Sequence, residues 1–150
     1  TNSHRLSLSV PRIGGQSTPT QAEKYAISQE MTRWARVGHV MCTVIIDKAY
    51  QLLNDPRFQV WDNLTTRPIP GTDPPIDGFL NGDTHSNLST GDSYAHLWIE
   101  RLHQDNGRGA ASTMFHEAVH ALDALDANLS LTESEAAMLA NYCVANEPNF

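Results

Sequence analysis

The sequence predicts an α+β fold in which a helical N-terminal half precedes a small sheet and two further helices. Three observations support this class: apolar residues recur at helical spacing over 20–53, alternate at strand spacing over 93–100, and recur again over 110–125 without Gly or Pro. With 150 residues, 40% hydrophobic and 18% charged, the chain is expected to form one folded domain spanning 1–150.

The N-terminal half is predicted to hold an arm and two helices. Residues 1–19 are rich in Ser, Thr, Gly and Pro and are expected to form an arm or a short strand. A first helix is predicted over 20–36, with Thr20 as its N-cap. A second helix is predicted after Gly38, ending before Asn54-Asp55-Pro56, although three consecutive β-branched residues at 44–46 leave a strand open there.

The middle of the chain is predicted to be mostly irregular. A short strand is expected over 58–60, after which residues 62–92 hold eight of the 17 Gly and Pro residues (9 Gly plus 8 Pro). Such a long loop in a small domain is commonly functional, and we expect it to face a substrate. Asn81-Gly82 is a candidate turn for one hairpin inside it. A longer strand is predicted over 93–100, followed by a polar turn over 103–109.

The third apolar helix carries the segment His116-Glu117-Ala118-Val119-His120. Residues four apart share one face of a helix, so His116 and His120 can bind one zinc ion, while Glu117 can reach a water molecule on that ion. The arrangement HExxH is typical of hydrolytic zinc sites and predicts one Zn²⁺ per chain.

A catalytic zinc needs a third protein ligand, and three carboxylates compete for that role. Glu135 is preferred because it lies on the apolar stripe of a helix predicted from about residue 130, although it also fits a capping box with Thr132. Glu133 lies off that stripe and remains an alternative. Asp126 stands ten residues after His116, where metzincins place their third ligand, but Asp123 occupies the position of the metzincin glycine.

The net charge and the hydrophobic pattern of the chain limit which kinds of partner are expected. A formal charge of −7 with ten scattered basic residues argues against nucleic acid, and no apolar run approaches a membrane span. Cys42 and Cys143 are expected to be two buried thiols. The other histidines of the folded region lack a helical metal-ligand partner and are expected to be surface or capping residues: His39, His85, His96 and His103.

With these residues in place, the chain resembles the zincin metallopeptidases, and more narrowly the gluzincins, in which a Glu on the next helix joins the two motif histidines. The order of elements is also similar to small effector zinc proteases of bacterial secretion systems, of the NleD type, and distantly to clostridial neurotoxin light chains. The resemblance implies a protein secreted, or translocated into a host cell. It also implies an edge strand beside the motif helix, here 94–100, with His96 and Trp98 as candidate cleft residues and ordinary sheet packing as their equal alternative.

The expected function is therefore zinc-dependent hydrolysis of a peptide bond in a protein substrate. Glu117 is the predicted general base for a zinc-activated water, and Tyr142 is a candidate donor to the oxyanion, with a half-buried core role as its alternative. Two other functions remain open: a non-catalytic binding module that recognises a protein partner through the 62–92 loop, and zinc-dependent hydrolysis of a non-protein amide.

Overall fold

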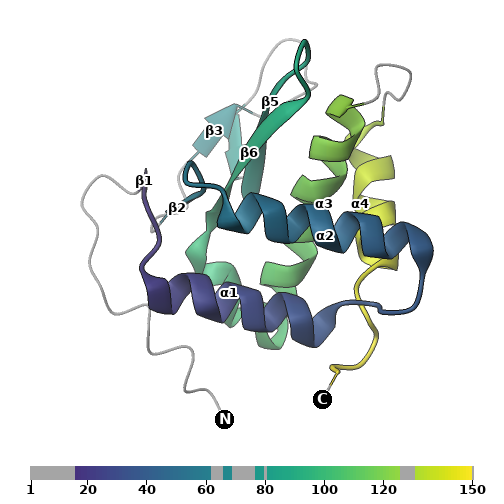
Figure 1. The fold of residues 1–150 in the computed structure, drawn as a ribbon. Helices are drawn as coiled ribbons and strands as arrows, with labels where there is room; N and C mark the ends of the chain where they lie inside the picture. The colour runs from purple at the N-terminus through teal and green to yellow at the C-terminus, as the bar shows by residue number, and fades with distance from the viewer. Residues whose placement is uncertain (1–15, 62–65, 69–76, 80, 126–130, 150) are drawn as a thin grey trace.

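The computed structural model describes residues 16–61, 66–68, 77–79, 81–125 and 131–149, and over these ranges the protein is α+β (Figure 1). The helices are α1 (Gln21–Trp34), α2 (Val40–Asn54), α3 (Arg108–Leu125) and α4 (Glu133–Tyr142), with a kinked 3₁₀ segment, η2 (Ile99–Gly107), before α3. The strands are β1 (Gln16–Ser17), β2 (Gln59–Trp61), β3 (Thr66–Pro68), β4 (Asp77–Phe79), β5 (Gly82–Asn87) and β6 (Asp92–Trp98).

Both N-terminal helices form as predicted. Thr20 caps α1 in a capping box, since its hydroxyl accepts from the Glu23 backbone N–H at 3.1 Å and its own N–H donates to the Glu23 carboxylate at 2.8 Å. The β-branched run at 44–46 is helical, because α2 turns Ile45 into the core, where it is 3% exposed. Of the predicted arm, residues 1–15 lie outside the described residues, and Gln16–Ser17 pairs with β2.

The main sheet has the strand order β1-β2-β6-β5, with β2 and β6 parallel and β5 and β6 antiparallel. The expectation that the strand near 94–100 is an edge strand is wrong, because β6 is hydrogen-bonded to β2 on one side and to β5 on the other. Among the described strands of this sheet, β5 forms the edge beside β6. The sequence placed β5 in the irregular 62–92 segment, which also holds β3 and β4, a separate antiparallel pair.

The hairpin between β5 and β6 turns at residues 88–91. The backbone N–H groups of Thr90 and Gly91 donate to the Asn87 carbonyl at 3.2 and 2.7 Å, and Gly91 has a φ of 74°, a conformation that favours glycine. The predicted turn at Asn81-Gly82 is not formed, because Gly82 begins β5 and the Asn81 carbonyl accepts from the Trp98 backbone N–H at 2.8 Å.

The HExxH helix, α3, lies at the centre of the fold. It packs against α1, α2, α4 and η2 and against strands β5 and β6 (Figure 1). Small and apolar side chains make these contacts close: Ala110, Ala111, Met114, Phe115 and Ala118 are fully buried. A helix held on so many sides gives the motif residues a rigid support.

A disulfide joins Cys42 in α2 to Cys143 at the end of α4. This corrects the expectation of two free thiols, which rested on the lack of any paired spacing in a chain with only two cysteines. The bond connects positions 101 residues apart in sequence, and both residues are fully buried.

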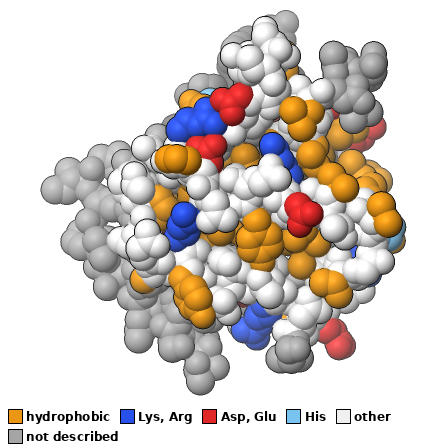
Figure 2. Space-filling view, viewed as in Figure 1, with side chains coloured by type: hydrophobic (Ala, Val, Ile, Leu, Met, Phe, Trp, Pro, Cys, Tyr) orange, Lys and Arg blue, Asp and Glu red, His pale blue; other side chains and the backbone are white. Residues whose placement is uncertain are grey.

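Figure 2 views the face formed largely by α1 and α2, on which hydrophobic side chains are interspersed with charged ones. Tyr25, Val40 and Val44 are exposed hydrophobic residues of these two helices. None of the described helices combines the length and the apolar character needed to cross a bilayer.

Candidate metal centre

The spacing within α3 places the two motif imidazoles side by side. The Nε2 atoms of His116 and His120 are 2.9 Å apart, and the ring centroids are 4.7 Å apart. The side chains of His116 and His120 are 21% and 22% exposed, so both rings reach the surface of the protein. Their nitrogen atoms converge on one point that solvent can reach.

Glu133, the first residue of α4, completes this group. Its Oε2 atom lies 3.0 Å from His116 Nε2, and its Oε1 atom lies 3.1 Å from His120 Nε2. The three side chains can each offer a ligand atom, and these atoms lie within 4.8 Å of one another. Two imidazole nitrogens and one carboxylate oxygen form a ligand set typical of catalytic zinc, with an open position toward solvent.

Electrostatics favour the neutral, metal-binding form of His116. Burial lowers the pKa of His116, and the neighbouring His120 lowers it further, against the opposing effect of the Glu133 carboxylate. A neutral imidazole offers a lone pair to a metal ion, whereas a protonated one does not. The three side chains can therefore hold a metal ion, and the lowered pKa of His116 favours its neutral, ligating form.

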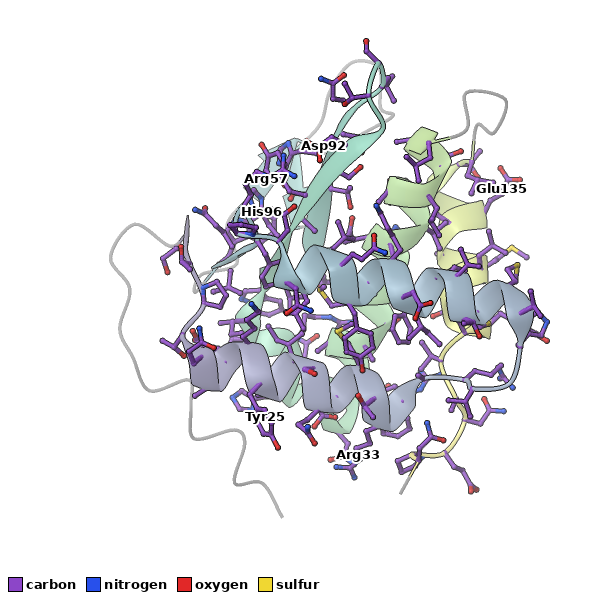
Figure 3. The ribbon with its side chains drawn as sticks, viewed as in Figure 1. Tyr25, Arg33, Arg57, Asp92, His96 and Glu135 are labelled. Atoms are coloured by element: carbon purple, nitrogen blue, oxygen red, sulfur yellow. A yellow bond between two sulfur atoms is a disulfide. The ribbon has the colours of Figure 1, made fainter. Side chains whose placement is uncertain are left out.

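The third-ligand expectation for Glu135 is corrected by this geometry. Glu135 caps α4, since its carboxylate accepts from the Thr132 backbone N–H at 3.0 Å and its own N–H donates to the Thr132 hydroxyl at 3.1 Å. These cap hydrogen bonds lower the pKa of its exposed carboxyl group. Figure 3 shows Glu135 on the outer side of α4. The alternative at Asp126 lies outside the described residues.

Glu117 is buried between α3 and β5, with 5% of its surface exposed. The Thr84 hydroxyl donates to its Oε1 atom at 2.8 Å, and a Cβ placed on Gly82 would lie 3.3 Å from its Oε2 atom. Burial raises the pKa of Glu117 to about 8; the Thr84 hydrogen bond opposes this rise, and the charges of Asp83 and Glu133 add to it. With this pKa the carboxyl group is mostly protonated at neutral pH in the absence of a metal ion, and a cation bound nearby would favour the ionised form that can act as a base.

The predicted role of Tyr142 is not supported by its position. Tyr142 ends α4, nine residues and about 13 Å along the helix from Glu133. Its side chain is half exposed, its ring packs edge-on against His39 with 5.1 Å between centroids, and the Arg36 guanidinium lies 5.0 Å from its ring centroid. Tyr142 therefore belongs to the contact between α4 and the start of α2, not to the candidate centre.

The structure also brings together residues that the sequence did not connect. Thr84 becomes a partner of Glu117 only because β5 packs on α3. A second group, Asp83, His85 and His96, gathers on the β5–β6 hairpin. Helical spacing predicts neither contact. The first depends on how β5 packs on α3, and the second depends on how β5 pairs with β6.

Comparison with models of known protein families, with curated proteins and with solved structures gave no match. The chemistry of the site must therefore be argued from its own residues.

Proposed function

We propose that the chain is a zincin-like, gluzincin-type metallopeptidase that hydrolyses peptide bonds in a protein substrate. The observation that carries the proposal is the convergence of His116, His120 and Glu133, together with the buried carboxylate of Glu117, which directly follows His116 in α3. A group that served only to bind zinc structurally would have no use for Glu117 beside it.

Held by these three side chains, a zinc ion would supply Lewis-acid activation of a water molecule and of the substrate carbonyl group. Glu117 is assigned as the general base, accepting a proton from the attacking water and returning it to the leaving amine nitrogen. Thr84 holds one carboxylate oxygen, Oε1, so the proton is assigned to Oε2. Gly82 leaves space for that oxygen, because a larger residue would meet it.

The substrate is assigned to the free edge of β5. This strand packs on α3 next to Glu117, and among the described strands it pairs only with β6. An extended peptide that adds to such an edge gains main-chain hydrogen bonds largely independent of its sequence. The assignment moves the substrate-binding strand from the predicted 94–100 segment to β5, and it favours unfolded or extended segments as substrates.

An oxidising location is proposed for the mature protein, in keeping with secretion. The Cys42–Cys143 disulfide supports it, because such bonds persist outside reducing compartments and are rare within them. A protein working in a reducing host cytosol would not keep this bond.

The test compares the parent chain with Glu117→Gln on a proteome-derived peptide library read by mass spectrometry. The Gln side chain keeps the shape and can still accept from Thr84, so we expect normal folding and zinc content but a loss of cleavage by at least about 100-fold, the scale of a lost general base. Glu135→Gln is the matched control on α4, because Gln also completes a capping box. Full cleavage by Glu117→Gln would exclude the mechanism, and zinc binding without any cleavage by the parent chain would favour a binding module.

A further inference from the structure

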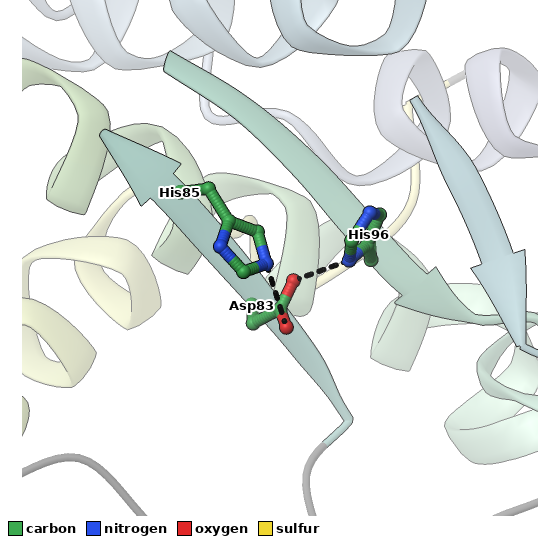
Figure 4. Close-up of side chains that lie close together, drawn as sticks. All are labelled: Asp83, His85 and His96. Carbon is green, nitrogen blue, oxygen red and sulfur yellow. Dashed lines mark ion pairs between the residues drawn. The ribbon is translucent and has the colours of Figure 1, made fainter. Parts of the chain in front are cut away.

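The β5–β6 hairpin carries a second group of metal-ligating side chains on the face that points away from α3. Gly82 and Thr84 approach α3, so the alternation of a strand turns Asp83 and His85 to the opposite face. His96 joins them from β6, where it stands directly across from Asp83 in the strand register. Figure 4 shows the Asp83 carboxylate between the two imidazole rings.

The distances within this group are those of atoms that share a small volume. Asp83 Oδ1 lies 2.8 Å from His96 Nδ1, and Asp83 Oδ2 lies 3.3 Å from His85 Nε2. One ligand atom from each residue lies within 4.8 Å of the others. Two imidazoles and a carboxylate again form the ligand set used by zinc and related divalent ions.

Two of these atoms are buried without a hydrogen bond. His96 Nδ1 and Asp83 Oδ1 lie 2.8 Å apart as an ion pair, and among the described residues neither atom has a partner in hydrogen-bond geometry. His96 is 7% exposed, so water cannot readily satisfy its nitrogen. Buried polar atoms without well-formed hydrogen bonds are unfavourable, and a metal ion would coordinate both atoms at once.

The surroundings hold the group in place and leave one side accessible. The His96 ring packs against Trp61 and Tyr94 at centroid distances of 5.8 Å each, and the His85 ring stacks on Tyr94 at 5.0 Å. The three side chains line a pocket of about 740 Å³, together with Arg57, Gln59 and Tyr94. An ion bound here would keep positions for water or a small anion from the pocket.

We propose that Asp83, His85 and His96 form a second divalent-metal site, selective for zinc-like transition ions and separate from the candidate centre on α3 and α4. The site stands on its own contacts and does not depend on peptidase activity. His96, which is 7% exposed, is not the surface residue that was expected, whereas His85 lies at the surface as expected.

The test titrates Zn²⁺ into the metal-free full chain and counts bound zinc by elemental mass spectrometry after desalting. We expect about two zinc ions per parent chain, about one in His116→Ala/His120→Ala, and about one in Asp83→Asn/His85→Gln. His103→Gln, a partly exposed histidine of η2 outside both groups, is the matched control and should keep both ions. Histidine-detected NMR should show zinc-dependent shifts of the His85 and His96 rings that Asp83→Asn removes.

Every outcome separates the two sites. One ion that survives His116→Ala/His120→Ala and is lost in Asp83→Asn/His85→Gln would support the second site and contradict the first. One ion lost entirely in His116→Ala/His120→Ala would overturn the second site. Two ions unaffected by Asp83→Asn/His85→Gln would overturn it as well. Should Asp83→Asn/His85→Gln fail to fold, His85→Gln alone serves the same purpose, since the His85 side chain is 49% exposed.

Discussion

Glu133 is the residue on which the candidate zinc centre depends most directly, because it alone comes from outside the HExxH helix. We predict that Glu133→Gln weakens zinc binding by more than about 100-fold, beyond the roughly 10–100-fold typical of residues that only orient a ligand. The reason is the loss of the carboxylate that approaches both imidazoles. Competition with a chromophoric chelator measures the change.

Glu135→Gln provides the comparison for that measurement, on the same turn of α4. It removes a carboxylate of equal charge that contacts the helix cap and not the histidines. Zinc affinity should stay within about threefold of the parent value, since a charge change at this distance contributes little in water. Equal loss in both variants would show that the first turn of α4, and not the Glu133 side chain, sets the affinity.

The sequence alone did not distinguish Glu133 from Glu135 as the third ligand. The pair Ser130 and Glu133 and the pair Thr132 and Glu135 both fit a capping box, and the capping box that forms uses Thr132 and Glu135. The apolar stripe that favoured Glu135 is not the buried face of α4, because Met138 and Tyr142 are exposed whereas Ala136 and Ala140 are buried. The approach of His116 to His120 was predictable because it depends on helical spacing alone, whereas the contact of Glu117 with Thr84 was not.

At the scale of one element, β5 supplies the hydrogen bond that holds the Glu117 carboxylate. Thr84→Val keeps the shape of the side chain but removes the donor to Oε1 at 2.8 Å. We predict a loss of about 1–3 kcal/mol in the free energy of unfolding, the cost of an unmatched buried partner, with zinc content unchanged and turnover reduced. Urea denaturation in the presence of a chelator measures the stability.

Ser86→Ala is the control for Thr84→Val, because Ser86 lies on the same strand and face but bonds the Ser93 hydroxyl at 2.8 Å instead of Glu117. Ser86→Ala should lower the free energy of unfolding by less than half as much as Thr84→Val does, and it should leave turnover unchanged. A similar fall in turnover for both variants would mean that β5 acts through its overall stability and not through the Thr84 contact.

The start of β6 is tied to the α2–β2 turn by Arg57, whose guanidinium donates to Asp55 and Asp92 at 2.7–3.0 Å (Figure 3). The hydrogen bonds from Arg57 lower the pKa of both carboxyl groups below the ordinary 3.8. Their stabilising effect is therefore fully present above about pH 4 and is lost as the pH falls toward the lowered values.

It follows that Arg57→Gln should flatten the acid side of the stability profile. The thermal midpoint of the parent should fall more steeply than that of the variant below pH 4, and the difference at neutral pH should shrink in high salt, since the pairs are exposed. Circular dichroism melts from pH 2.5 to 7 measure both. Parallel profiles for the two proteins would show that these ion pairs do not contribute to stability.

Among the elements, the helices and the strands β2 and β6 were predictable, whereas β3, β4 and β5 were not. α1, α2 and α3 carry their own periodicity, and Thr20 marks the start of the first. β5 does not alternate in hydrophobicity, because its inner face carries Gly82 and Thr84 and its outer face carries Asp83 and His85. When both faces of a strand hold polar residues, hydrophobic and polar residues do not alternate along it, so the sequence pattern does not reveal the strand.

At the scale of the whole molecule, the Cys42–Cys143 disulfide connects the second helix to the last one. Closing a segment of 101 residues restricts the unfolded chain, and loops of that size are associated with about 4–5 kcal/mol in the entropic treatment. We predict that Cys42→Ala/Cys143→Ala lowers the free energy of unfolding by about 2–5 kcal/mol. Zinc stoichiometry should be retained, because Cys143 follows the opposite end of α4 from Glu133.

Urea denaturation of metal-free protein measures this change without a contribution from zinc. The parent chain reduced under the same conditions is the control, because it keeps the cysteine side chains and loses only the bond. If reduction left the unfolding free energy unaltered while the double variant lost stability, the effect would come from the packing of the two side chains.

The pleat of β5 connects the two candidate metal sites. One face of the strand contacts Glu117 beside the α3 site, and the other face carries Asp83 and His85 of the second site. Odd and even positions of this six-residue strand serve opposite faces, Asp83 and His85 on one and Gly82 and Thr84 on the other. A slip of one residue against β6 would exchange these faces, placing a charged side chain against α3 and the threonine in the pocket. One insertion in the 88–91 turn would then disable both sites together, so the length of that turn is under a double constraint.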